Sequence, residues 1–140
     1  EHHRAMTHVF FNGEHLVGDR SNGIVYRLCP DCSTDNLEPI LRERVTPVIN
    51  PQGSQLVFDA VELILQVGQQ ENTKPVVRLD WSDDCGKSWS KDRVLDFGAI
   101  GEFKKRTIFN RLGQSRNRVF RLRISDSSRL VVLGAKARVR

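Results

Sequence analysis

Residues 82–89 read Ser82-Asp-Asp-Cys-Gly-Lys-Ser-Trp89 and fit the Asp-box pattern Ser-x-Asp-x-Gly-x-Ser/Thr-Trp at every defined position. In such a segment the carboxylate of Asp84 folds back onto N–H groups of the turn, and Gly86 supplies the positive φ that the turn needs. The hydroxyl of Ser88 closes the turn, and the large ring of Trp89 packs the hairpin onto the residues beneath it. The segment predicts a β-hairpin in which Ser82, Asp84, Gly86, Ser88 and Trp89 are structural residues and not a catalytic site.

The chain before residue 30 reads as short strands joined by tight turns. Residues 7–11 are strand-like and end at Asn12-Gly13, and a second polar turn ends at Asn22-Gly23 before the strand-like residues 24–28. Asn-Gly is a dipeptide that tight hairpin turns favour. Because three short strands cannot bury a core by themselves, we expect residues 1–30 to be a β-meander that forms part of a larger, propeller-like unit.

A polar connector, residues 31–37, precedes a second domain that we place at residues 38–140. Residues 54–68 of this domain fit both a strand face and a helical stripe. Their valine and phenylalanine content and the glycines on either side favour a strand.

Alternation of apolar and polar residues continues to the end of the chain. Residues 129–139 place Val131, Leu133, Ala135, Ala137 and Val139 on one face of a strand. About seven such strands after residue 37 predict an antiparallel β-sandwich or a small barrel that contains the Asp-box hairpin. The predicted fold class is all-β.

The composition is that of a globular protein. Of the 140 residues, 39% are hydrophobic and 28% charged, and no apolar run approaches the roughly 18 residues that span a membrane. The first residues show no initiator methionine and no signal-peptide pattern. We therefore expect a piece of a longer protein, with no membrane contact.

The formal net charge is +5, and the basic residues gather in one part of the sequence. Between residues 103 and 124 there is no acid, and the basic residues are Lys104, Lys105, Arg106, Arg111, Arg116, Arg118, Arg121 and Arg123. One interpretation is a basic face for DNA or for an acidic protein partner. The other is a solvated strand face balanced by the acids of the neighbouring hairpin.

Residue patterns for catalysis or metal binding are missing. No nucleophile and base can be paired, no phosphate-binding glycine loop occurs, and Cys29-Pro-Asp-Cys32 has no second cysteine pair to complete a zinc site. His8 and His15 flank a predicted turn and could meet, but they lack a third ligand. We predict a protein that is not an enzyme and has no cofactor and no metal, with turn-associated thiols made in a reducing compartment.

Several segments, taken in order, resemble one protein family. They are residues 8–26, 42–47, 79–90, 98–103, 110–120 and 123–126, followed by Val-Leu-Gly-Ala135. Together they resemble the C-terminal part of the packaged-DNA stabilisation proteins of short-tailed bacteriophages. The resemblance covers most of the chain and is more specific than the Asp box alone.

This resemblance implies a structural virion protein of the tail and portal-vertex hub. Such proteins are made in the bacterial host cytoplasm, form a homo-oligomeric ring beneath the portal, and close the DNA exit channel after packaging. The implied partners are the phage portal and the tail-needle and other tail proteins. The candidate DNA or acidic-partner face would then be Lys104, Lys105, Arg106, Arg116, Arg118, Arg121 and Arg123.

Two other functions stay open at the level of sequence. Asp-box hairpins recur in glycan-binding propellers, so the chain could be a carbohydrate-binding or adhesive β-module with Trp81 and Trp89 as its aromatic platform. A nucleic-acid-binding β-barrel is the third, since aromatic residues beside basic strands can stack bases.

Overall fold

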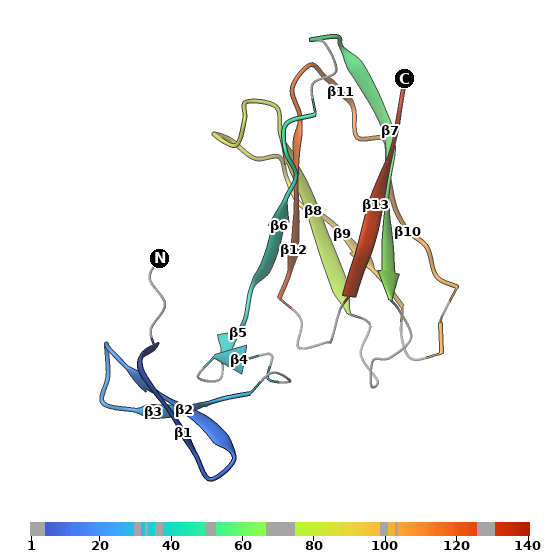
Figure 1. The fold of residues 1–140 in the computed structure, drawn as a ribbon. Helices are drawn as coiled ribbons and strands as arrows, with labels where there is room; N and C mark the ends of the chain where they lie inside the picture. The colour runs from blue at the N-terminus through green and yellow to red at the C-terminus, as the bar shows by residue number, and fades with distance from the viewer. Residues whose placement is uncertain are drawn as a thin grey trace. The chain divides into compact units, whose positions relative to one another are not determined.

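The structure, a computed structural model, describes residues 5–29, 32, 34–35, 38–49, 53–66, 75–98, 101–102, 104–125 and 131–140. Every helix or strand position assigned in these ranges is a β-strand, and no helix is present there (Figure 1). This confirms the all-β prediction. The chain forms two compact units, Glu1–Cys32 and Ser33–Arg140.

The first unit is a three-stranded antiparallel meander in the order β1-β2-β3. Its strands are β1 (Ala5–Phe11), β2 (Glu14–Asp19) and β3 (Val25–Leu28). Asn12 and Gly13 both have positive φ, 49° and 81°, as a tight hairpin turn with the right-handed twist of its strands requires. Val17 is buried, whereas the apolar side chains of Met6, Val9, Phe10, Phe11, Ile24, Val25 and Leu28 are exposed. The meander therefore buries almost no core of its own.

The second unit is built mainly from two antiparallel sheets, which Figure 1 shows as two layers. In one, β7 (Leu56–Gln66) pairs with β10 (Thr107–Asn110) and β11 (Gln114–Ser115) on one side and with β13 (Val131–Val139) on the other. The other has the order β6-β12-β8-β9, with β6 at Arg42–Val45, β12 at Val119–Ile124, β8 at Val76–Ser82 and β9 at Arg93–Asp96. β4 (Thr34–Asp35) and β5 (Glu38–Pro39) form a separate short ribbon.

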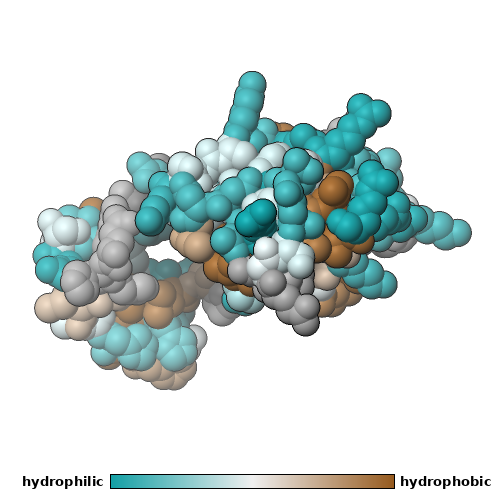
Figure 2. Space-filling model, turned by 90° about the horizontal axis from the view of Figure 1, so that it is seen from above, coloured by the Kyte–Doolittle hydropathy of each residue, from teal (hydrophilic) through white to brown (hydrophobic). Residues whose placement is uncertain are grey.

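The core lies between these two sheets. Its buried members are Phe58, Val61, Leu63, Val77, Leu79, Phe97, Phe109, Leu112, Phe120, Leu122 and Ile124. They come from β7, β8, β10, β12 and the segments next to them, so each sheet contributes its inward-facing side chains. In the space-filling view, hydrophilic side chains cover much of the visible face, and apolar residues reach the surface in patches between them (Figure 2).

Residues 54–68 contain the strand β7, as the sequence favours. A β-bulge explains why apolar residues three positions apart, a spacing typical of a helix, share one face of this strand. Arg138 pairs with Ala60 and the next residue, Val139, pairs with Phe58, so Asp59 is an extra residue on β7. This β-bulge reverses the alternation of the strand. Phe58 and Val61, three residues apart, therefore both face the core.

A second bulge corrects the predicted face of the last strand. Val132 pairs with Leu65 and Gly134 with Ile64, which leaves Leu133 as the extra residue. Leu133 is 67% exposed and does not share the inward face with Ala135 and Ala137. Sequence alternation alone could not show this, because the bulge depends on the pairing with β7.

Candidate functional site

The Asp-box hairpin connects β8 to β9, and Asp84 organises its turn. Oδ1 of Asp84 accepts hydrogen bonds from the backbone N–H groups of Lys87 (2.9 Å) and Ser88 (2.8 Å) and from the Ser82 hydroxyl (2.7 Å). Its Oδ2 accepts a bond from the Ser88 hydroxyl at 2.6 Å. The carboxylate is thus directed into its own loop.

Ser82 and Gly86 complete the turn from the other side. The Ser82 oxygen, which is buried, accepts a hydrogen bond from the Gly86 N–H at 2.7 Å. Gly86 has a φ of 95°, a conformation that residues with a Cβ rarely adopt, and Cys85 before it is also left-handed at 62°. Two consecutive positive φ angles reverse the chain within a few residues.

These hydrogen bonds also set the charge state of Asp84. The Ser82 and Ser88 hydroxyls, together with backbone N–H groups, hold the pKa of Asp84 far below its ordinary value. Asp84 is therefore ionised at any physiological pH, and its acceptor oxygens are occupied by the turn. This arrangement fits a structural clasp and gives no general acid or base.

The two tryptophans are each covered by arginine. The Arg121 guanidinium lies 3.8 Å from the centre of the Trp89 ring. Trp81, which packs against the core, has Arg93 and Arg118 each at 5.3 Å from its ring centre. Both rings are partly buried, and an arginine next to each leaves less of its surface open for stacking on a sugar.

Arg118 is the buried centre of the Asp-box end of the sandwich, at 2% exposure. It donates to both carboxylate oxygens of Asp83, at 2.6 and 2.8 Å, and to the Leu112 carbonyl at 2.6 Å. The rings of Phe58, Trp81 and Phe120 surround its guanidinium at 4.8, 5.3 and 5.9 Å. Arg118 therefore ties the hairpin to the loop between β10 and β11.

The charge state of Asp83 reflects this contact. Partial burial raises the pKa of Asp83, but hydrogen bonds from Arg118 and Ser115 outweigh it and hold the pKa below its ordinary value.

A second cluster lies on the outer face of the β12 and β8 pair. Asp80, only 1% exposed, stands opposite Arg121 in the register and accepts hydrogen bonds from its Nε (3.0 Å) and Nη2 (2.5 Å). Arg123 donates to Asp80 at 3.0 Å and to Asp92 at 2.5 Å. The hydrogen bond with Asp80 raises the pKa of Arg121 still further. Both arginines are held by carboxylates of the neighbouring strand and hairpin.

The remaining candidate residues are divided among other surroundings. Arg106 forms a two-pronged ion pair with Glu62 of β7, at 2.7 and 2.9 Å. Lys105 contacts Asp96 and lies 3.8 Å from Glu102. Lys104 and Arg116 are exposed.

The structure places the residues of the candidate basic face in different surroundings. They do not share one surface, because Arg118 is inside the sandwich, Arg121 and Arg123 are on the outer face of one sheet, and Arg106 pairs with the other sheet. Internal carboxylates balance most of them, which is the alternative interpretation of this segment. The acidic residues within 80–92 are the feature of the sequence that indicates this charge balance.

Other candidate chemistry is limited in the described ranges. His8 and His15 do meet across the first hairpin, with Nε2 and Nδ1 2.8 Å apart and the rings stacked. Among the described residues, no three His, Cys, Asp or Glu side chains are grouped as a metal site would need. The part of the chain that the structure describes also contains no helix long and apolar enough to cross a membrane.

Two sheets packed face to face around one core define a β-sandwich domain, to which the Asp-box hairpin belongs. Residues 41–140 match the family model described as "Bacteriophage P22 Gp10, beta-sandwich". This match covers more than half of the chain, and the chain belongs to that family. It is thus a structural protein of a phage virion, and its interactions are with other virion proteins. A search of curated proteins finds no match to the sequence.

Proposed function

We propose that this chain is part of the tail hub at the portal vertex, where it closes the DNA exit channel and stabilises the packaged genome through protein–protein interfaces. The observation that carries this proposal is the family match over residues 41–140. The geometry agrees with it, because Asp84, Arg118 and Arg121 serve internal contacts and none presents a reactive group. A mechanical role needs a rigid scaffold, and these contacts provide one.

The exposed meander supports assembly into something larger. A small sheet with Met6, Phe10 and Phe11 at 60 to 68% exposure leaves apolar surface that soluble proteins normally cover. We propose that residues 1–30 belong to a propeller-like unit whose neighbouring strands cover these side chains. Residues 38–140 then form the β-sandwich domain, with residues 31–37 as the connector.

The partners in this proposal are the portal and the tail-needle and other tail proteins, in a homo-oligomeric ring of the full-length protein. Contact with DNA is a weaker part of it. Arg118, Arg121 and Arg123 are committed to Asp83, Asp80 and Asp92, so phosphate groups would have to displace these carboxylates. Lys104 and Arg116 remain exposed for such a contact.

The test is DNA retention in phage particles that are assembled without this protein. Under the proposal such particles package DNA and then release it, so that the DNA becomes sensitive to nuclease, and adding the full-length protein restores protection. Protein carrying Lys91→Glu, a change at an exposed residue outside the candidate DNA contact, should restore it equally. Particles that keep their DNA but fail to attach to host cells would contradict the proposal and support the carbohydrate-binding alternative.

A further inference from the structure

The two lateral edges of the sandwich differ. At the edge formed by β9 and β10, Arg93 bridges the sheets by donating to the carbonyl oxygens of Asn110 (2.5 Å) and Arg111 (2.9 Å). At the opposite edge, β6 pairs only with β12 and β13 only with β7 among the strands of the described ranges. Between β6 and β13 lies a groove of about 740 Å³. This edge is therefore open, and each of its two strands has one edge without a described strand partner.

The floor of the groove is apolar, and the inward face of β13 that borders it carries small side chains. Ala135 stands opposite Leu63 and Ala137 opposite Val61, so the alanines face the same side as these core residues. Both alanines are nevertheless exposed, and no residue of β13 belongs to the core cluster. The groove is the space that larger side chains would have filled.

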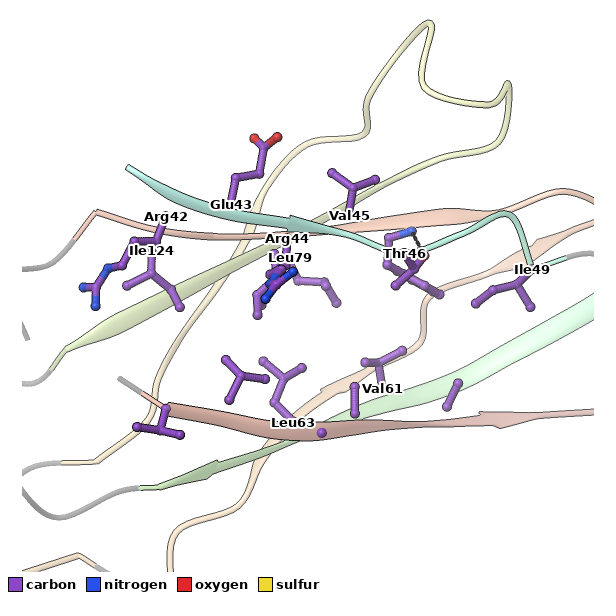
Figure 3. Close-up of a pocket in the computed structure, with 17 residues that line it drawn as sticks. Arg42, Glu43, Arg44, Val45, Thr46, Ile49, Val61, Leu63, Leu79 and Ile124 are labelled. Atoms are coloured by element: carbon purple, nitrogen blue, oxygen red, sulfur yellow. Dashed lines mark hydrogen bonds between the residues drawn. The ribbon is translucent and has the colours of Figure 1, made fainter. Parts of the chain in front are cut away.

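Positive charge lies on the β6 wall of the groove and on the outward side of β13. Arg44 stands opposite Leu122 in the register and thus projects from β6 on the inward side of its sheet. Figure 3 shows Arg44 directed into the groove, whereas Glu43 and Val45 point away from it. On β13, exposed Lys136 and Arg138 alternate with the groove-facing alanines. Among the described residues that border the groove, Glu43 is the one acid, and its carboxylate points to the outer face, 4.0 Å from Arg121.

These features specify the chemistry of an occupant. An extended segment placed beside β13 would point every second side chain into the apolar groove, next to Ala135 and Ala137. The side chains between them would lie beside Lys136 and Arg138, where opposite charges across neighbouring strands attract. Inward-pointing arginines such as Arg44 discourage indiscriminate pairing of an open edge. The preference for carboxylates comes from Lys136 and Arg138, which face outward on β13.

We propose that the β6–β13 groove binds an extended segment of another virion protein, in which apolar and acidic side chains alternate, and that this segment adds a strand to β13. This mode of recognition draws its affinity from main-chain hydrogen bonds and its specificity from alternate side chains. The proposal rests on the proposed function for the existence of a protein partner, and it adds the site and the chemistry of that partner.

The first test measures peptide binding to the 140-residue chain by fluorescence anisotropy at low salt. The probe is a labelled ten-residue peptide of alternating valine and glutamate, and its counterpart alternates valine and lysine. We expect only the glutamate peptide to bind. In Lys136→Glu/Arg138→Glu its affinity should fall about tenfold or more, since two attractive pairs become repulsive.

Matched variants separate the groove from general electrostatics. Lys104→Glu/Arg116→Glu makes the same change of charge at exposed residues outside the groove and should alter affinity less than about twofold. Ala137→Phe fills the groove at an exposed position and should abolish binding while the urea midpoint stays unchanged. Binding of both peptides alike, of neither, or equally to all variants would overturn the proposal.

The second test uses assembled virions and a carbodiimide, which joins a lysine amine to a carboxylate in direct contact with loss of one water. We expect mass spectrometry to find Lys136 joined to an Asp or Glu in a segment of a different virion protein. Coupling only to Glu62 of its own chain, or to a second copy of this chain, would refute the proposed occupant. If both tests fail although particles that contain this protein retain their DNA, the groove proposal alone is refuted. If particles that lack this protein also retain their DNA, the proposed hub function alone is refuted.

Discussion

Replacing Arg118 by methionine is the most direct test of how the Asp-box end of the sandwich is held together. Methionine keeps an unbranched apolar stem between Phe58 and Phe120 but removes all five N–H donors. The change therefore isolates the guanidinium from the packing of the side chain. Arg116→Met, at an exposed position two residues earlier, is the matched control.

The expected cost follows from the contacts of Arg118. The Leu112 carbonyl loses its 2.6 Å donor next to a side chain that is 1% exposed, and a buried acceptor without a partner costs about 1–3 kcal/mol. Loss of a desolvated cation among aromatic rings costs about 2 kcal/mol. Asp83 is 46% exposed, so water replaces Arg118 there and the broken ion pair adds little. We expect a total of about 3–5 kcal/mol.

Urea unfolding followed by tryptophan fluorescence measures this cost, because Trp81 and Trp89 both lie in the sandwich unit. With a urea slope of about 2 kcal/mol per molar, the midpoint of Arg118→Met should fall by about 2 M. Arg116→Met should stay within about 0.5 kcal/mol of the parent. If Arg118→Met lost less than about 1 kcal/mol, the buried guanidinium would not be a structural centre.

Three further predictions concern the hairpin and the meander. Hydrogen bonds hold the pKa of Asp84 below its unfolded value of 3.8, so the stability that it adds is complete above that pH and is lost as the pH falls toward the folded-state pKa. The difference in urea midpoint between the parent and Asp84→Asn should therefore be constant from pH 7 to about pH 5 and shrink in stronger acid; a constant difference down to pH 2.5 would contradict the assignment. Gly86→Ala should lower the free energy of unfolding by roughly 1–3 kcal/mol, measured in the same way, because φ is 95° there while a Cβ would meet only an ordinary contact with Trp89; an unchanged midpoint would show that the turn relaxes. Amide hydrogen exchange should be faster in residues 5–28 than in β12, since the meander buries almost no apolar surface, and equal protection would argue against an incomplete propeller-like unit.

Local patterns were enough to predict the elements whose causes are local. The Asp-box residues bond one another within residues 82–88, so their spacing in the sequence already contains the geometry of the turn. Asn12-Gly13 likewise specifies the first hairpin, because both residues tolerate the positive φ that the turn needs. Apolar and polar residues alternate in β8 and β12, and Leu79, Phe120 and Leu122 lie in the core as that local pattern requires.

Features that depend on pairing between distant strands were not predicted. The bulges at Asp59 and Leu133 arise where the register between β7 and β13 shifts by one residue. They change which side chains face the core. The sequence alone predicts an outward-facing cation at Arg121. The pairing of β12 with β8 places it opposite Asp80, forty-one residues earlier in the chain. The sequence groups Arg118 with the basic residues of a candidate surface, whereas the approach of Asp83 and Leu112 makes it a buried hydrogen-bonding centre.

The sequence by itself determined an all-β chain with an Asp-box clasp, a meander rich in apolar residues, and a place in a phage structural family, since these follow from local turn chemistry and residue order. Only the tertiary structure decided that the arginines of β12 are neutralised and that the β6–β13 edge is open. Charge neutralisation and groove shape depend on which strands become neighbours. That choice is made by long-range packing between the sheets, which no local pattern encodes.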